Sequence, residues 1–143
     1  MPTPTAAQLA DAVTAAMNAA DWSVEFTATR ETVPIQDRDQ MGSATYVKVA
    51  PVGLTATTIS RAKTERTIEV DVAVLKAMDN FANATVDPLA ALVEAIGEFW
   101  LRTPLASPAA TCVEISVPSL CMPESARELL FVGAITLTFK LYT

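Results

Sequence analysis

Two carboxylates in one run of alternating residues are the best candidates for chemistry in this sequence. Glu69 and Asp71 lie within residues 67–74, where polar and apolar residues alternate. Side chains two positions apart on a β-strand point to the same face, so this pair could supply a general acid and a general base. No other catalytic group accompanies them, and we favour a solvated or inter-subunit face as their role.

The composition excludes several classes of catalytic site. The 143-residue chain has no histidine, which excludes Ser-His-Asp and Cys-His catalysis and removes the commonest transition-metal ligand. Its four glycines form no phosphate-binding loop, so a dinucleotide site and a P-loop are excluded as well. We therefore expect no enzyme activity and no cofactor.

Two motifs with metal-ligand residues are incomplete. Residues 37–42 resemble the start of a calcium loop, but Met41 and Lys48 occupy its fifth and twelfth positions, where oxygen ligands are needed. Cys112 and Cys121 provide two thiols, and a metal site needs more ligands than two. We expect no bound metal and two reduced thiols, with a redox pair as the alternative.

The charge balance limits the partners. The net charge is −6 and the isoelectric point is about 4.5, which argues against nucleic acid as the main partner because phosphate binding needs clustered Lys and Arg. An acidic ring around a DNA conduit is compatible with this charge, since repulsion prevents sticking. No apolar run approaches the roughly 20 residues of a membrane span, and no signal peptide is found, so we expect cytoplasmic synthesis and no membrane partner.

The expected elements form a single domain over residues 1–143. Apolar residues at helical spacing predict helices over residues 5–20 and 87–101. Alternation predicts strands over residues 23–30, 45–52, 64–75, 111–117 and 131–142. The order α-β-β-β-α-β-β indicates an α+β fold, with a mixed, mostly antiparallel sheet of about five strands and two helices packed on one face.

Local signals set the expected boundaries of the second helix. Asp87 is the expected N-cap and Pro88 occupies the first turn. A mobile connection over residues 78–86 should precede them. Trp22 and Trp100, which flank the helices, are expected to anchor the core or an interface.

The strand boundaries follow from breaks and alternation. Pro51 and Gly53 should end the second strand, which leaves residues 53–63 as a loop or a long hairpin tip. Regular alternation over residues 111–117 points Val113 to the core and Cys112 away from it. In the third and last strands, the expected core faces are Ile68, Val70, Val72 and Val74, and Phe131, Gly133, Ile135, Leu137, Phe139 and Leu141.

Four segments in this order carry a resemblance to a known family. They are Val-Lys-Val-Ala-Pro-Val-Gly at 47–53, Ser60-Arg61 leading into Thr-Ile-Glu-Val-Asp-Val-Ala-Val at 67–74, Asp-Pro-Leu-Ala-Ala-Leu-Val-Glu-Ala-Ile at 87–96, and Phe-Val-Gly-Ala-Ile-Thr-Leu-Thr-Phe at 131–139. Together they resemble the tail terminator proteins of long-tailed bacteriophages. The resemblance covers nearly the full chain, and related neck and tail-completion proteins share much of the pattern.

The resemblance implies a structural protein of the virion. It implies a homo-oligomeric ring, commonly a hexamer, that caps the tail tube and stops polymerisation of the tube protein. The other face of the ring would meet the head–tail connector or stopper protein, with DNA passing through the lumen as cargo. Subunit or tube contacts are expected from Arg61, Lys63, Arg66, Glu69, Asp71, Asp37, Arg38 and Asp39.

Three hypotheses follow for the function. The first is the ring-forming terminator or neck protein, in which a basic tip of one copy meets the acidic strand face of the next. The second is a monomeric adaptor that binds a partner through loops or by strand addition at an exposed sheet edge. The third is a small carboxylate-dependent enzyme that uses Glu69 and Asp71.

Overall fold

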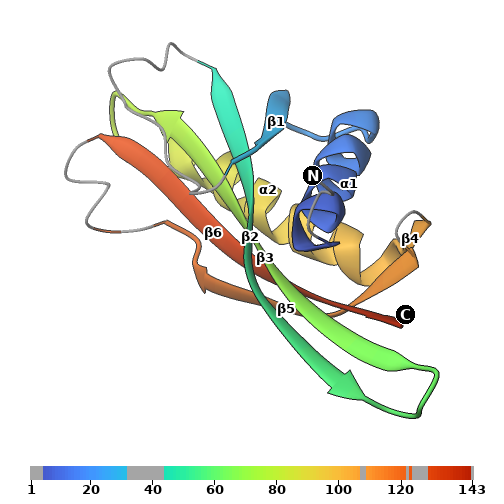
Figure 1. Cartoon of the computed structure of the whole chain (residues 1–143). Helices are drawn as coiled ribbons and strands as arrows, with labels where there is room; N and C mark the ends of the chain where they lie inside the picture. The colour runs from blue at the N-terminus through green and yellow to red at the C-terminus, as the bar shows by residue number, and fades with distance from the viewer. Residues whose placement is uncertain (1–4, 32–43, 107–108, 122, 124–128, 143) are drawn as a thin grey trace.

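The structure, a computed structural model, describes residues 5–31, 44–106, 109–121, 123 and 129–142. Two helices pack on one strongly twisted sheet (Figure 1). The elements are α1 (Thr5–Ala19), β1 (Phe26–Arg30), β2 (Thr45–Thr58), β3 (Thr64–Ala77), α2 (Asn83–Arg102), β4 (Leu105–Ala106), β5 (Ala109–Ser119) and β6 (Leu130–Tyr142). The predicted α+β fold is confirmed, with the short β4 as an added strand.

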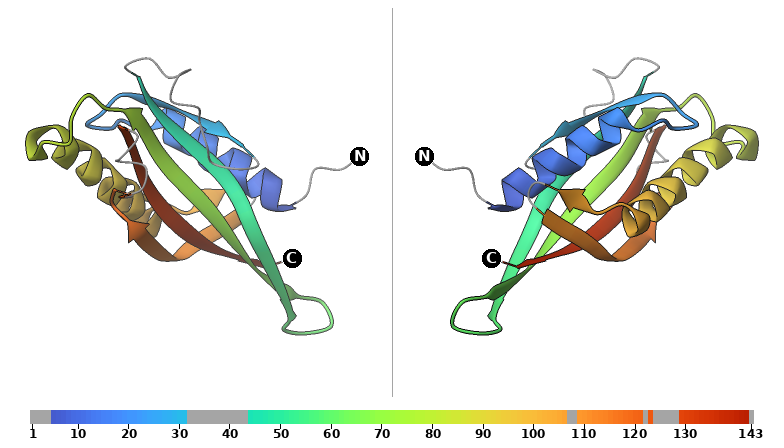
Figure 2. Two further views of the ribbon diagram at one scale, coloured as in Figure 1. Left: turned by 90° about the vertical axis from the view of Figure 1, so that its left-hand side faces the viewer. Right: turned by 90° about the vertical axis from the view of Figure 1, so that its right-hand side faces the viewer.

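The sheet is mixed and mostly antiparallel, as predicted. Its strand order is β1-β2-β3-β6-β5-β4, and only β1 pairs with its neighbour in parallel. Both helices bury their apolar stripes in one cluster with the sheet, so they cover the same face (Figure 2). We call this the helix face and the opposite one the outer face. The predicted core residues of β3 and β6 are buried on the helix face.

Polar side chains attach α1 to the edge strand β1. The Asn18 side-chain amide donates to the carbonyl of Ala28 at 2.9 Å and accepts from the N–H of Ala28 at 2.8 Å. It therefore makes the two hydrogen bonds that a neighbouring strand would make at this edge. The Trp22 indole N–H donates to the Met17 carbonyl at 2.8 Å, which satisfies one of the carbonyls left open at the helix end. The Trp22 ring contacts Phe99 of α2, which confirms its predicted anchoring role.

The second helix begins one turn earlier than predicted. Asn80 Oδ1 accepts from the Ala82 N–H at 3.0 Å and from the Thr85 hydroxyl at 3.3 Å, and this organises the start of α2 at Asn83. The predicted cap at Asp87 is therefore wrong, and the predicted connection over 78–86 is shorter than expected, because residues 83–86 belong to α2. Pro88 lies inside the helix, where its missing N–H removes only one bond close to the N-terminus.

A β-bulge changes the predicted faces of β5. The register with β6 shifts between Cys112 and Glu114, so Cys112 pairs with Phe139 on the helix face and is only 4% exposed. Val113 is the extra residue and is 48% exposed. The predicted orientations of these two side chains are wrong, because one inserted residue reverses the alternation.

The second strand continues through the predicted break. A register shift between Pro51 and Gly53 marks a second bulge, after which β2 pairs with β3 as far as Thr58. The Val49 carbonyl accepts a hydrogen bond from the Glu31 N–H at 2.8 Å. The backbone groups of alternate residues of β2 therefore point away from β3, towards the outer edge of this strand. Pro51 shares this orientation, and its missing N–H costs no bond to β3. The prediction that the strand ends here is wrong, and the long hairpin is correct.

Two buried glycines give a matched test of the packing between α2 and the sheet. A Cβ on Gly133 would lie 2.5 Å from Val93 Cγ2, 3.0 Å from the Leu120 carbonyl oxygen and 3.3 Å from Phe131 Cε1. A Cβ on Gly97 would meet mainly the flexible end of Ile115, at 2.6 Å. Gly133→Ala should lower the free energy of unfolding by about 1–3 kcal/mol.

Gly97→Ala is the control, because the gain in helix propensity of about 1 kcal/mol offsets the shift of one terminal methyl group. Chemical denaturation of both variants measures the difference. Equal stabilities would contradict the tight approach of β6 to α2.

Candidate interaction surface

The β2–β3 hairpin extends beyond the part of the sheet that the helices cover. Figures 1 and 2 show its tip, residues 59–63, as the part farthest from the helices. Residues 52–63 are all exposed, including Leu54 at 49% and Ile59 at 55%. Between Pro51 and Lys63 the hairpin has two cations and no carboxylate. The hairpin is therefore basic, with exposed apolar side chains among its hydroxyl residues, and it contributes little to the core.

No other described strand pairs with the outer edge of β2 along the hairpin. Among the described residues, β1 pairs with β2 only up to Val49. Ile59 N–H donates to the Lys63 carbonyl at 3.1 Å, and residues that bond across an antiparallel pair alternate with residues that point outward. The backbone groups of Leu54, Ala56 and Thr58 therefore point outward, where they are available to a further strand.

The outer face of the sheet centre is acidic. Glu69 of β3, Thr138 of β6 and Glu114 of β5 are cross-strand neighbours, so their side chains share this face. Asp71 lies beside them and accepts a hydrogen bond from the Thr136 hydroxyl at 2.8 Å.

One cation of this face is held by a further carboxylate. Lys140 Nζ lies 3.4 Å from Glu65 Oε1, and the two side chains come from β6 and β3. Lys140 thus offsets one of the four carboxylates Glu65, Glu69, Asp71 and Glu114, and the face stays negative.

The structure brings only some of the predicted interface residues together. Arg61 and Lys63 lie exposed on the tip, and neither forms an ion pair with another described residue. Glu69 and Asp71 share the outer face, whereas Arg66 pairs with Ala56 and Leu141 on the helix face. Alternation along β3 alone could have placed Arg66 there. Asp37, Arg38 and Asp39 lie outside the described residues.

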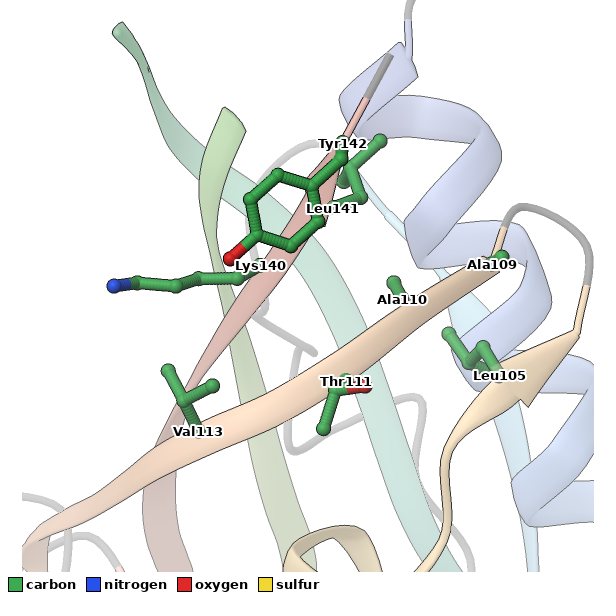
Figure 3. A pocket seen from close by; sticks show the side chains of 8 residues that line it. All are labelled: Leu105, Ala109, Ala110, Thr111, Val113, Lys140, Leu141 and Tyr142. Carbon is green, nitrogen blue, oxygen red and sulfur yellow. The ribbon is translucent and has the colours of Figure 1, made fainter. Parts of the chain in front are cut away.

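Within the part of the chain that the structure describes, two open cavities lie at the ends of the sheet, and sequence reasoning missed both. One, of about 410 Å³, is a notch where β5 and β6 diverge (Figure 3), and it is lined by Leu105, Ala109, Ala110, Thr111, Val113, Lys140, Leu141 and Tyr142. The other, of about 400 Å³, lies at the start of β1 and β2. Neither cavity is lined by Glu69 or Asp71, which lie on an open sheet surface. No sequence signal marks a point where strands diverge.

The residues considered as metal ligands or reactive thiols lie in surroundings that fit a structural role. Within the described ranges, no three His, Cys, Asp or Glu side chains gather as metal ligands. Lys48, at the twelfth position of the suspected calcium loop, is buried and pairs with Glu31 at 3.3 Å. Burial raises the pKa of both Cys112 and Cys121, which disfavours the reactive thiolate at neutral pH. Within the described residues, no helix combines the length and apolarity that a membrane span requires.

Comparison of the chain with protein-family models and with curated protein sequences found no match.

The alternation along the free edge can be tested with two proline substitutions. Ala56→Pro removes an outward N–H and should change the stability of the hairpin by less than about 0.5 kcal/mol. Thr55→Pro removes an N–H that bonds to β3, and it should destabilise the hairpin by about 1–3 kcal/mol. Hydrogen exchange of the hairpin amides measures both effects. The reverse order would show that β2 turns its other edge outward.

Proposed function

We propose that the chain is a ring-forming structural protein of the tail terminator type, acting at the junction of tail and head in a long-tailed bacteriophage virion. Copies join head to tail into a ring, commonly a hexamer in that family. The ring caps the tail tube and ends its polymerisation, and its other face binds the head–tail connector or stopper protein. DNA passes through the lumen as cargo.

The observation that carries this proposal is the pair of complementary surfaces on one chain. The tip presents Arg61 and Lys63 without a carboxylate, and the outer face presents Glu69, Asp71 and Glu114. Pairing of β2 with β3 up to Thr58 keeps the hairpin extended, so the tip does not fold back onto its own outer face. Two different patches that complement each other favour a heterologous contact, and such a contact generates a ring when the rotation between copies closes.

The acidic outer face also suits a conduit. Carboxylates on a lumen wall repel the phosphate backbone, so DNA would slide past without binding. The same carboxylates lie on an open surface, whereas acid–base catalysis needs them in a cleft that separates their pKa values. This placement supports a structural role over the carboxylate-dependent enzyme.

A second candidate function rests on the free edge of β2. An adaptor could accept an extended partner peptide against Leu54, Ala56 and Thr58, with main-chain bonds supplying the affinity. Ala56→Pro separates the two functions. It should abolish binding of such a peptide, and a ring held by the charged tip should keep its stoichiometry.

Reversing the charge of the tip tests the ring. Arg61→Glu would place a carboxylate against the acidic outer face of the next copy, so we expect assembly to weaken by about tenfold or more, equivalent to about 1.4 kcal/mol. The fold should be unchanged, since Arg61 is exposed. Light scattering over a concentration series measures assembly, and thermal unfolding checks the fold.

Lys76→Glu, which reverses a half-buried charge at the other end of β3, is the control and should leave assembly intact. Electron microscopy of the protein with tail tubes then tests capping. A strict monomer at all concentrations, without rings when tube protein is present, would overturn the proposed function. Unchanged rings in Arg61→Glu would remove the tip from the interface.

A further inference from the structure

The notch between β5 and β6 has unused apolar surface. The two strands pair at Thr111 and Lys140 and then diverge, because the chain before Thr111 turns to pair with β4 (Figure 3). Val113 is 48% exposed and Tyr142 is 58% exposed at the notch. Large exposed apolar side chains around one concave site indicate a docking surface.

We propose that the notch receives the hairpin tip of a second copy of this chain, with the Ile59 side chain seated in the cavity. This inference rests on the proposed head-to-tail assembly and specifies its contact. The tip brings the matching surface, since Ile59 is 55% exposed and is the tip's largest apolar side chain. A cavity of about 410 Å³ has room for that side chain and the backbone that carries it.

Charge favours the tip over other occupants. Glu114 and Glu65 do not line the notch but are next to residues that do, since Glu114 follows Val113 and Glu65 of β3 pairs with Tyr142 of β6. Lys140 lines the notch, and its ammonium group lies 3.4 Å from Glu65. Together, Glu114, Glu65 and Lys140 give the surroundings of the notch a net charge of −1. The incoming tip carries two cations.

The chain's own tip is not available to this notch. The β3–β6 pairing ends at Glu65 and Tyr142, and the hairpin continues beyond that pair to the tip. Bending it back would break the hydrogen bonds between β2 and β3. A second copy can reach the notch with every strand pair intact, and the contact would cover Ile59, Val113 and Tyr142 together.

Disulfide trapping tests this contact directly. In a background with Cys112→Ala and Cys121→Ala, one sample carries Ile59→Cys and the other carries Val113→Cys. After mixing and mild oxidation, we expect disulfide-linked heterodimers to form about tenfold faster than with a Lys76→Cys partner, since docking raises the effective concentration of the thiols. Non-reducing electrophoresis and mass spectrometry of the linked peptides measure the rates.

Two failures are distinguishable in that experiment. Rings that form while Val113→Cys and Lys76→Cys react equally slowly would overturn the notch contact and leave the proposed function standing. A protein that stays monomeric at every concentration, with and without tube protein, would overturn both.

A charge swap gives a second measurement. Arg61→Glu and Glu114→Lys should each weaken assembly. The double variant should assemble about tenfold more tightly than the sum of the two separate losses would give. Arg61→Glu with Asp87→Lys, an exposed site on α2, should recover nothing. Additive losses in the first double variant would contradict an approach of the tip to the notch.

Discussion

The uninterrupted pairing of β3 with β6 fixes the position of the other elements. Its register runs without a shift from Glu65–Tyr142 to Ala77–Leu130, whereas the β2–β3 pair contains one register shift and the β5–β6 pair contains two. A slip of one residue would turn the core side chains of the slipped strand to the outer face, where Ala73, Leu75 and Val132 form only a small cluster. α1 packs over β1 and β2 on one side of this pair, and α2 packs over β5 and β6 on the other, so the pair joins both halves of one core. The hairpin extends from the start of β3, and the notch lies at the end of β6.

The sequence was most informative where alternation is regular. The core faces of β3 and β6 follow from period two, because every second residue over 68–74 and 131–141 is apolar or glycine, while most residues between them are polar. Period two fails at Val113, since nothing in the run Thr-Cys-Val-Glu shows that one residue is inserted. It fails again at Pro51, where a residue that usually ends strands lies at an edge that tolerates it.

The candidate surface was only partly predictable for a related reason. Exposure of Arg61 and Lys63 follows from a polar hairpin tip, and the shared face of Glu69 and Asp71 follows from their spacing. The early start of α2 depends on the side chain of Asn80, a short-range bond that competes with the cap expected downstream. The notch depends on where two strands part, and that is set by their tertiary neighbours.

Because the hairpin lies outside the core, its sequence is constrained by what it contacts and not by the packing of the helices. Substitutions within residues 53–63 leave the packing of α1 and α2 untouched, so this segment can diverge at little penalty to folding. A residue added to each of its strands would move the tip outward by about 3.3 Å and turn it over, because side chains alternate. A change in hairpin length can therefore alter what the tip reaches while the scaffold beneath it stays the same.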